Sequence, residues 1–284
     1  MRVLLTGATG TMGRVVTPHL VSSGFEVRAL SREPRTDPAV DWRRADLATG
    51  RGVRQAFDGV EAVVHMATLA HRGRRTATVD VYGTRGLLEC ARSAGVGHVV
   101  FPSIVGVDQA PVGYFAHKLR AERLVADSGL GWTILRATPF HQWLDGLLAR
   151  APFLPADRTI PWQPVDARDV AAFLVDLLTG GPRKTIENYA GPEVLATDEL
   201  AGQWRRARGR RLPLPPVRWP GRTAAAQRAG LLNGPARGRI TWTRYLSPLG
   251  ASTEEPDIAA EYGGPSIEMP DRRGDEGYEP PTRV

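Results

Sequence analysis

Short apolar runs alternate with amphipathic stretches along much of the chain. Such runs predict buried strands, and apolar positions that recur every three to four residues predict helices. The expected strands are Arg2–Thr6, Glu26–Leu30, Ala62–Met66, His98–Pro102, Trp132–Arg136 and, at a sheet edge, Thr185–Ala190. The expected helices are Gly13–Ser23, Val53–Phe57, Val79–Ser93, Tyr114–Ser128 and Asp169–Leu178. This alternation predicts an α/β fold, a Rossmann-type doubly wound parallel sheet with helices on both faces.

Charge and cysteine content narrow the function classes. The net charge is +7, but nearly all the basic residues are arginines scattered along the chain, without interleaved aromatics. We therefore expect no nucleic-acid partner. No apolar run approaches the roughly 18 residues needed to cross a bilayer, so we expect no membrane partner. Cys90 is the only cysteine and the histidines lack ligand spacing, which argues against disulfides and metal sites and favours a cytoplasmic protein.

A glycine-rich turn follows the first predicted strand. Gly7, Gly10 and Gly13 are spaced as G-x-x-G-x-x-G, with a strand before them and a helix after them. Gly7 permits a tight turn, Gly10 lets the backbone approach a pyrophosphate, and Gly13 allows close helix–strand packing. The free N–H groups of the helix N-terminus then favour phosphate. We expect this turn, including Thr9, Thr11 and Met12, to bind a dinucleotide, although an ordinary turn between a strand and a helix is the alternative.

The end of the second strand bears on the choice of dinucleotide. An acidic residue there favours NAD, whereas an arginine accommodates the 2′-phosphate of NADP. The strand ends Leu30-Ser31-Arg32, without an acid at the first two positions past Leu30. Ser31 and Arg32 can both bind a phosphate, so we expect NADP(H) to be preferred over NAD(H).

Tyr114 and Lys118 lie four residues apart and share a face of a predicted helix. A nearby ammonium stabilises a phenolate, so the pair could move a proton to or from a substrate oxygen. A solvated pair, with Lys118 bridging to Glu122, is the alternative. Ser103 follows the strand His98–Pro102 at the edge where ligands bind, and could hold a substrate carbonyl. Tyr114, Lys118 and Ser103 are the expected catalytic residues.

Together these motifs resemble the atypical short-chain dehydrogenase/reductase superfamily, in its NmrA-like, NAD(P)H-binding branch. The resemblance runs from residue 1 to about 248. The stretches that carry it are Thr6–Gly13, 45–47, 63–67, 103–108, 114–122, 132–136 and 166–171. It implies that Asp46 and Leu47 flank the adenine and that Ala67 lies under the cofactor, with Thr68 beside it. It also implies that Lys118 holds the nicotinamide ribose and that Pro139 contacts the cofactor, with Phe140, His141 and Trp143 near the substrate.

The resemblance implies an NAD(P)H-dependent oxidoreductase that transfers hydride between nicotinamide and a small carbonyl, quinone or enone. Asp80 stands where relatives often carry an asparagine that belongs to the proton relay. Some members of the branch bind dinucleotide without turning it over. A non-catalytic NADP(H)-binding redox sensor is therefore a second hypothesis, and an NAD-dependent sugar-nucleotide epimerase is a third.

Changes in composition predict three regions. Residues 1–190 would form the NAD(P)-binding core, with a lid insertion around 137–164, and 191–249 a small C-terminal substrate-binding region. Residues 250–284 hold nine acidic residues against three arginines, with many Pro and Gly. This composition predicts a disordered tail, or alternatively an acidic flap against the basic body. A small-molecule substrate is the expected partner, and a homodimer is an assembly the sequence allows.

Overall fold

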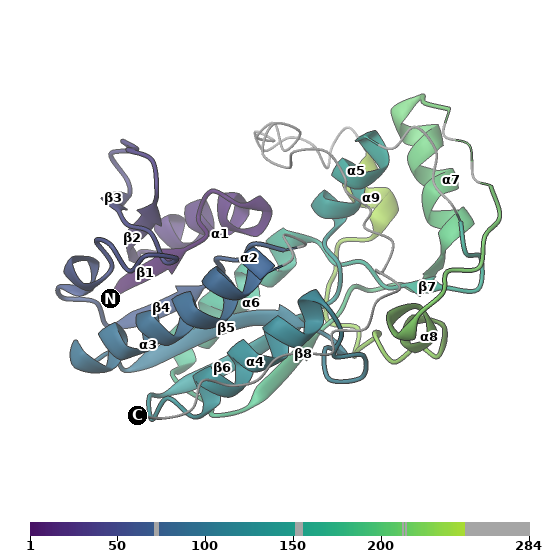
Figure 1. Ribbon diagram of the computed structural model, residues 1–284. Helices are drawn as coiled ribbons and strands as arrows, with labels where there is room; N and C mark the ends of the chain where they lie inside the picture. Colours follow the sequence, from purple (N-terminus) through teal and green to yellow (C-terminus); the bar gives the residue numbers. More distant parts are fainter. Residues whose placement is uncertain (71–73, 151–155, 212, 214, 248–284) are drawn as a thin grey trace, which may run out of the picture.

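The computed structural model describes residues 1–70, 74–150, 156–211, 213 and 215–247. The predicted disorder of 250–284 lies outside these residues. Within them, seven parallel strands form the main sheet in the order β3-β2-β1-β4-β5-β6-β8 (Figure 1). The strands are β1 (Arg2–Thr6), β2 (Glu26–Ser31), β3 (Asp41–Arg44), β4 (Ala62–His65), β5 (His98–Ile104), β6 (Trp132–Ala137) and β8 (Ile186–Tyr189). This order is that of Rossmann-type dinucleotide-binding sheets, so the predicted fold class is confirmed.

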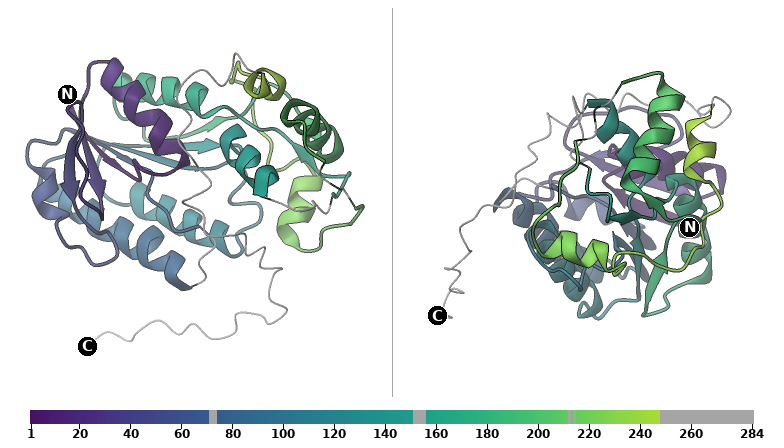
Figure 2. Two further views of the ribbon diagram at one scale, coloured as in Figure 1. Left: turned by 90° about the horizontal axis from the view of Figure 1, so that it is seen from above. Right: turned by 90° about the vertical axis from the view of Figure 1, so that its right-hand side faces the viewer.

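Helices cover both faces of the sheet, because each face is apolar. One face carries α1 (Thr11–Ser22) and α6 (Ala167–Gly180). The other carries η1 (Arg54–Phe57), α3 (Thr84–Ser93) and α4 (Tyr114–Ala126). The view from above in Figure 2 separates these two helical layers. Among the described residues, no helix is both long and apolar enough to cross a membrane.

The helix expected at Val79–Ser93 begins earlier and is not regular. It consists of α2 (Arg74–Ala77), the π-helix η2 (Thr78–Gly83) and α3 in direct succession. Asp80 lies in the π-helical part and is only 3% exposed. Short π-helical segments occur often at functional sites, because the wider turn reorients one or two side chains.

The C-terminal region lies beyond one end of the sheet (Figures 1 and 2). It contains α5 (His141–Arg150), α7 (Thr197–Arg208), α8 (Arg222–Arg228), α9 (Trp242–Leu246) and a two-stranded sheet of β7 (Pro161–Trp162) and β9 (Leu195–Ala196). Leu144 and Leu148 of α5 pack with Trp204 of α7 and Trp242 of α9 in one apolar cluster. Since β6 leads into α5 after three residues, this end is the carboxyl edge of the strands.

Buried polar contacts fasten the C-terminal region to the core. The Gln163 side chain donates to the carbonyl oxygens of Gly191 and Gly234 and accepts from the Gly234 amide. One carboxylate oxygen of Asp169 accepts from the amides of Arg239 and Ile240, at 2.8 and 2.9 Å. Segments far apart in sequence are thereby fixed beside the strand ends, where a ligand of this fold binds.

Candidate functional site

The β1–α1 turn has the geometry expected of a phosphate-binding loop. Gly7 has φ of +72°, and a Cβ there would lie 2.7 Å from the amide nitrogen of Ala67. A Cβ on Gly13 would lie 2.1 Å from the Gly7 carbonyl oxygen. A Cβ on Gly10, by contrast, would meet only Gly7 O at 3.4 Å, an ordinary contact. Packing thus requires Gly7 and Gly13, whereas the open space at Gly10 fits a bound pyrophosphate.

The N-terminus of α1 lies at the glycine turn. Gly10 is its N-cap, and no side chain within the described residues caps it. The Arg14 guanidinium instead donates to the Thr9 carbonyl oxygen at 2.7 Å and so braces the turn. Thr11 and Met12 are buried in the first turn and Thr9 is partly exposed. The N-terminus of a helix, with its backbone N–H groups and the positive end of the helix dipole, favours the binding of anions.

An arginine that the sequence analysis missed lies at the end of β2. Strand β3 was not predicted, and its register places Arg44 opposite Ser31. The Arg44 guanidinium donates to the Arg32 carbonyl oxygen at 3.3 Å. Both arginines are exposed, so Ser31, Arg32 and Arg44 together form a basic corner. The signal that could have found Arg44 is Trp42, an aromatic residue inside an otherwise polar run.

Asp46 and Leu47 follow β3 at the same sheet edge. Asp46 accepts from the Ala48 amide at 2.9 Å and is half-buried, as is Leu47. A Cβ on Gly83 would lie 3.0 Å from the Leu47 carbonyl oxygen, so η2 packs directly against this segment. Their predicted role beside an adenine stays a prediction.

A buried chain of hydroxyls and an imidazole lies beneath the turn. His65 Nδ1 is 2.7 Å from the Thr6 hydroxyl, and its Nε2 is 2.8 Å from the Thr84 hydroxyl. Thr84 donates to the Asp80 carbonyl, so it accepts from Nε2–H, and Thr6 must donate to Nδ1. Thr6 in turn accepts from the Ala67 amide at 3.1 Å. Burial, with a smaller effect of Lys118, lowers the pKa of His65 to about 3, so this histidine is neutral.

Tyr114, Thr68 and Asp80 form a connected group. The Thr68 hydroxyl lies 3.1 Å from the Tyr114 hydroxyl and 2.5 Å from one carboxylate oxygen of Asp80. The other oxygen of Asp80 accepts from the Leu69 amide at 2.9 Å. Thr68 directly follows Ala67, so this group adjoins the glycine turn.

The side chain of Lys118, on α4, is buried. Its ammonium donates to the Pro102 carbonyl oxygen at 2.7 Å and lies 4.0 Å from the centre of the Phe101 ring. Burial lowers its pKa to about 8, against the raising effect of Asp80 and Glu122. The alternative of a solvated Lys118–Glu122 pair is wrong, because both side chains are buried and Glu122 forms a two-point ion pair with Arg136.

Ser103 lies near the end of β5 and is 7% exposed. Its hydroxyl is a buried polar atom without a hydrogen-bond partner among the described residues. A buried hydroxyl without a partner is unfavourable unless a ligand or a water molecule satisfies it. This observation fits the predicted contact with a substrate carbonyl.

The four residues expected beyond β6 fall into different surroundings. Pro139 accepts from the Val165 amide, and Phe140 packs partly buried against the core. Trp143 packs against the C-terminal apolar cluster. His141 is completely buried, donates to the Pro164 carbonyl oxygen and contacts the rings of Trp242 and Tyr245. His141 therefore faces the protein interior in this structure, and its role near a substrate stays a prediction.

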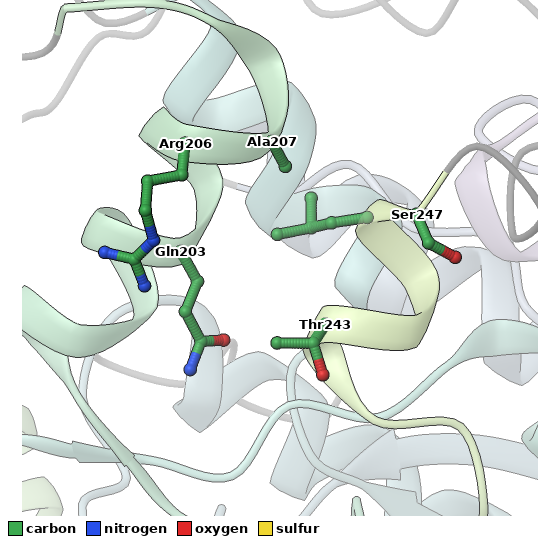
Figure 3. A pocket seen from close by; sticks show the side chains of 6 residues that line it. Gln203, Arg206, Ala207, Thr243 and Ser247 are labelled. Carbon is green, nitrogen blue, oxygen red and sulfur yellow. The ribbon is translucent and has the colours of Figure 1, made fainter.

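A hollow of about 360 Å³ lies elsewhere, between α7 and α9. It is lined by Gln203, Arg206, Ala207, Thr243, Leu246 and Ser247. Figure 3 shows Arg206 and Gln203 on the α7 side and Thr243 and Ser247 on the α9 side. None of these six residues is among the candidate site residues described above.

Comparisons with known proteins agree with this geometry. An uncharacterized Mycobacterium tuberculosis protein is 32% identical over 71% of this chain, and the chain spans only 23% of that protein's length. A (4-alkanoyl-5-oxo-2,5-dihydrofuran-3-yl)methyl phosphate reductase of Streptomyces griseus is 31% identical over 74% of this chain and 75% of its own. Among solved structures, Thermus thermophilus UDP-glucose 4-epimerase in complex with NAD has a TM-score of 0.66 at 24% identity, covering 79% and 88% of the two chains.

A family model described as NAD(P)H-binding matches residues 7–180. The match begins at the first glycine of the turn and ends with α6, so it includes Tyr114, Lys118 and Ser103. It confirms the resemblance stated from the motifs, and the chain belongs to the NAD(P)H-binding family of Rossmann-fold proteins.

Proposed function

We propose that the chain is an NADPH-dependent reductase of a small carbonyl, quinone or enone. The observation that carries this proposal is the contact path from the glycine turn to Tyr114. Gly7 packs against Ala67, and the next residue, Thr68, reaches the Tyr114 hydroxyl at 3.1 Å. A dinucleotide whose pyrophosphate lay on the turn would extend past Ala67 toward this phenol. When bound, NADPH would supply the hydride.

Three side chains have distinct roles in this proposal. Tyr114 donates a proton to the substrate oxygen that gains charge during reduction. The buried Lys118 ammonium stabilises the resulting phenolate through space, since the positive charge has little water to screen it. Ser103 donates its otherwise unpaired hydroxyl to the same substrate oxygen and orients it.

The basic corner supports a preference for NADPH. Arg32 and Arg44 bring two guanidinium groups to the end of β2, beside the Ser31 hydroxyl. A guanidinium group can bind two phosphate oxygens at once. In this fold the adenosine ribose lies at the end of the second strand, where this corner is. A 2′-phosphate would be bound there by charge, whereas NADH offers only hydroxyls.

The proposed substrate class is based on the name of one relative. The Streptomyces griseus protein is named as a reductase of an alkanoyl oxo-dihydrofuran. A ring that combines a carbonyl with unsaturation fits a site with a hydride source, a phenol donor and an unpaired hydroxyl. An enone of this kind is therefore the first compound to test.

Replacement of Tyr114 by phenylalanine tests the proposal. Tyr114→Phe should retain NADPH affinity and reduce turnover by at least about 100-fold, because the ring stays and the acid is lost. NADPH oxidation is followed across quinones, ketones and enones. Tyr82→Phe is the control, since Tyr82 is 58% exposed on η2. Unchanged turnover in Tyr114→Phe would remove the phenol from the mechanism, and absence of turnover by the unmodified chain across the panel would favour the redox-sensor hypothesis.

A further inference from the structure

The Thr68 hydroxyl contacts both Asp80 and Tyr114. An ionised carboxylate only accepts, and Asp80 receives the Leu69 amide on one oxygen and the Thr68 hydroxyl on the other. Thr68 has a single hydroxyl proton, and the 2.5 Å contact with Asp80 takes it. The same Thr68 hydroxyl lies 3.1 Å from the Tyr114 hydroxyl. The Asp80 carboxylate is thus no more than two hydrogen-bond lengths from the phenol oxygen.

Asp80 is held in place by the fold. Its side chain is 3% exposed in the π-helix η2, and its carbonyl oxygen accepts from the Thr84 hydroxyl. Thr84 belongs to the buried chain that ends at His65. The carboxylate therefore has fixed partners on both sides, and it lies one hydroxyl away from Tyr114.

Among the described residues, two elements bring charged groups to this part of the site, and a third brings a neutral histidine. Asp80 is on η2, Lys118 is on α4, and His65 on β4 is neutral. The Lys118 ammonium donates to the Pro102 carbonyl oxygen. Glu122, also on α4, is paired with Arg136. Asp80 is thus a negative charge linked to Tyr114 through the Thr68 hydroxyl, and a negative neighbour disfavours ionisation of a phenol.

We propose that Asp80, acting through Thr68, is a positioning residue that keeps Tyr114 in its protonated, donating form. This inference rests on the proposed function, in which Tyr114 is the proton donor. It also predicts the direction of the reaction. A phenol held protonated can donate a proton during reduction, whereas oxidation needs a phenolate that accepts a proton. Asp80 thereby has a role different from that of an asparagine, whose amide carries no charge.

The first experiment needs no substrate. Tyrosinate absorbance is titrated against pH, and the signal of Tyr114 is obtained as the difference from the Tyr114→Phe variant. In Asp80→Asn the midpoint should move to lower pH by at least about half a unit, because the opposing charge is gone. Glu89→Gln removes an exposed carboxylate on α3 and should leave the midpoint unchanged. An unmoved or raised midpoint in folded Asp80→Asn would overturn the proposal.

The second experiment uses turnover. Thr68→Val is isosteric and breaks the link, so kcat should fall at least about 10-fold with KM within about threefold, whereas Thr68→Ser should restore kcat. In Asp80→Asn the basic limb of the kcat profile should move to lower pH together with the titration midpoint. Equal rates in Thr68→Val and the unmodified chain would overturn the role of Thr68. If no compound is turned over, the proposed function fails, while the absorbance titration still decides the role of Asp80.

Discussion

The sequence predicts some of the residues at the strand ends, and the others can be identified only from the folded structure. Tyr114 and Lys118 were expected from their spacing on one helix, and both lie at the site. The partners of Lys118 could not be predicted, because Pro102 contributes a backbone oxygen, which no side-chain pattern reveals. Arg136 was visible only as the end of a strand. Its ion pairs with Glu122 and Asp108, at 2.7 and 3.0 Å, depend on neighbouring elements.

Removal of either arginine at the basic corner should separate the two cofactors. Arg32→Ala and Arg44→Ala should each weaken NADPH binding about 10-fold and change NADH binding less than about twofold, since only NADPH carries the 2′-phosphate. Titration calorimetry measures both affinities. Arg35→Ala is the control, because Arg35 is exposed nearby and stacks on Trp42. An equal loss for NADPH and NADH would contradict the proposed corner.

At the scale of secondary structure, buried elements were predictable and exposed or irregular ones were not. The core strands are predictable because their sequences are continuously apolar. Strand β3 reads Asp41-Trp42-Arg43-Arg44 and lies at an exposed edge, so Trp42 is its single apolar residue and no alternating pattern marks it. The π-helix η2 was not predicted, because its residues are also compatible with an α-helix. Its presence is a tertiary effect, since it brings Asp80 to Thr68.

The glycines of the β1–α1 turn should respond differently to one methyl group. Gly13→Ala should destabilise the fold by about 1–3 kcal/mol, because its Cβ would lie 2.1 Å from Gly7 O. Gly10→Ala should fold normally and lose at least about 10-fold in dinucleotide affinity, since its Cβ would occupy the space of the pyrophosphate. Chemical denaturation and calorimetry measure the two effects. Full NADPH affinity in Gly10→Ala would place the phosphate elsewhere.

At the scale of the whole molecule, the C-terminal region is packed together and tied to the core by contacts between segments far apart in sequence. The segment expected to be a lid contains α5, whose Leu144 and Leu148 pack with α7 and α9. Gln163 and Asp169 tie residues 234–240 to the core. Long-range contacts of this kind lack a local pattern, so the sequence alone could not show them. Whether this region binds substrate stays a prediction.

Two buried histidines should make the stability of the molecule sensitive to mild acid. Burial lowers the pKa of His65 to about 3 and that of His98 to about 4, from 6.5. The native chain then binds fewer protons than the unfolded chain, so stability is lost as pH falls below 6.5. Between about pH 7 and pH 5 each histidine should remove about 2 kcal/mol. Urea unfolding of His98→Gln should show a weaker dependence, and an identical one would contradict this assignment.

In the proposed function a dinucleotide lies along the strand ends, with its pyrophosphate on the β1–α1 turn and its nicotinamide beside Tyr114. A crystal structure of the chain with NADP⁺ tests this most directly. We expect phosphate oxygens on backbone amides of the first turn of α1, the 2′-phosphate between Arg32 and Arg44, and the nicotinamide ring next to the Tyr114 hydroxyl. A pyrophosphate bound away from the turn, or a nicotinamide directed away from Tyr114, would contradict it.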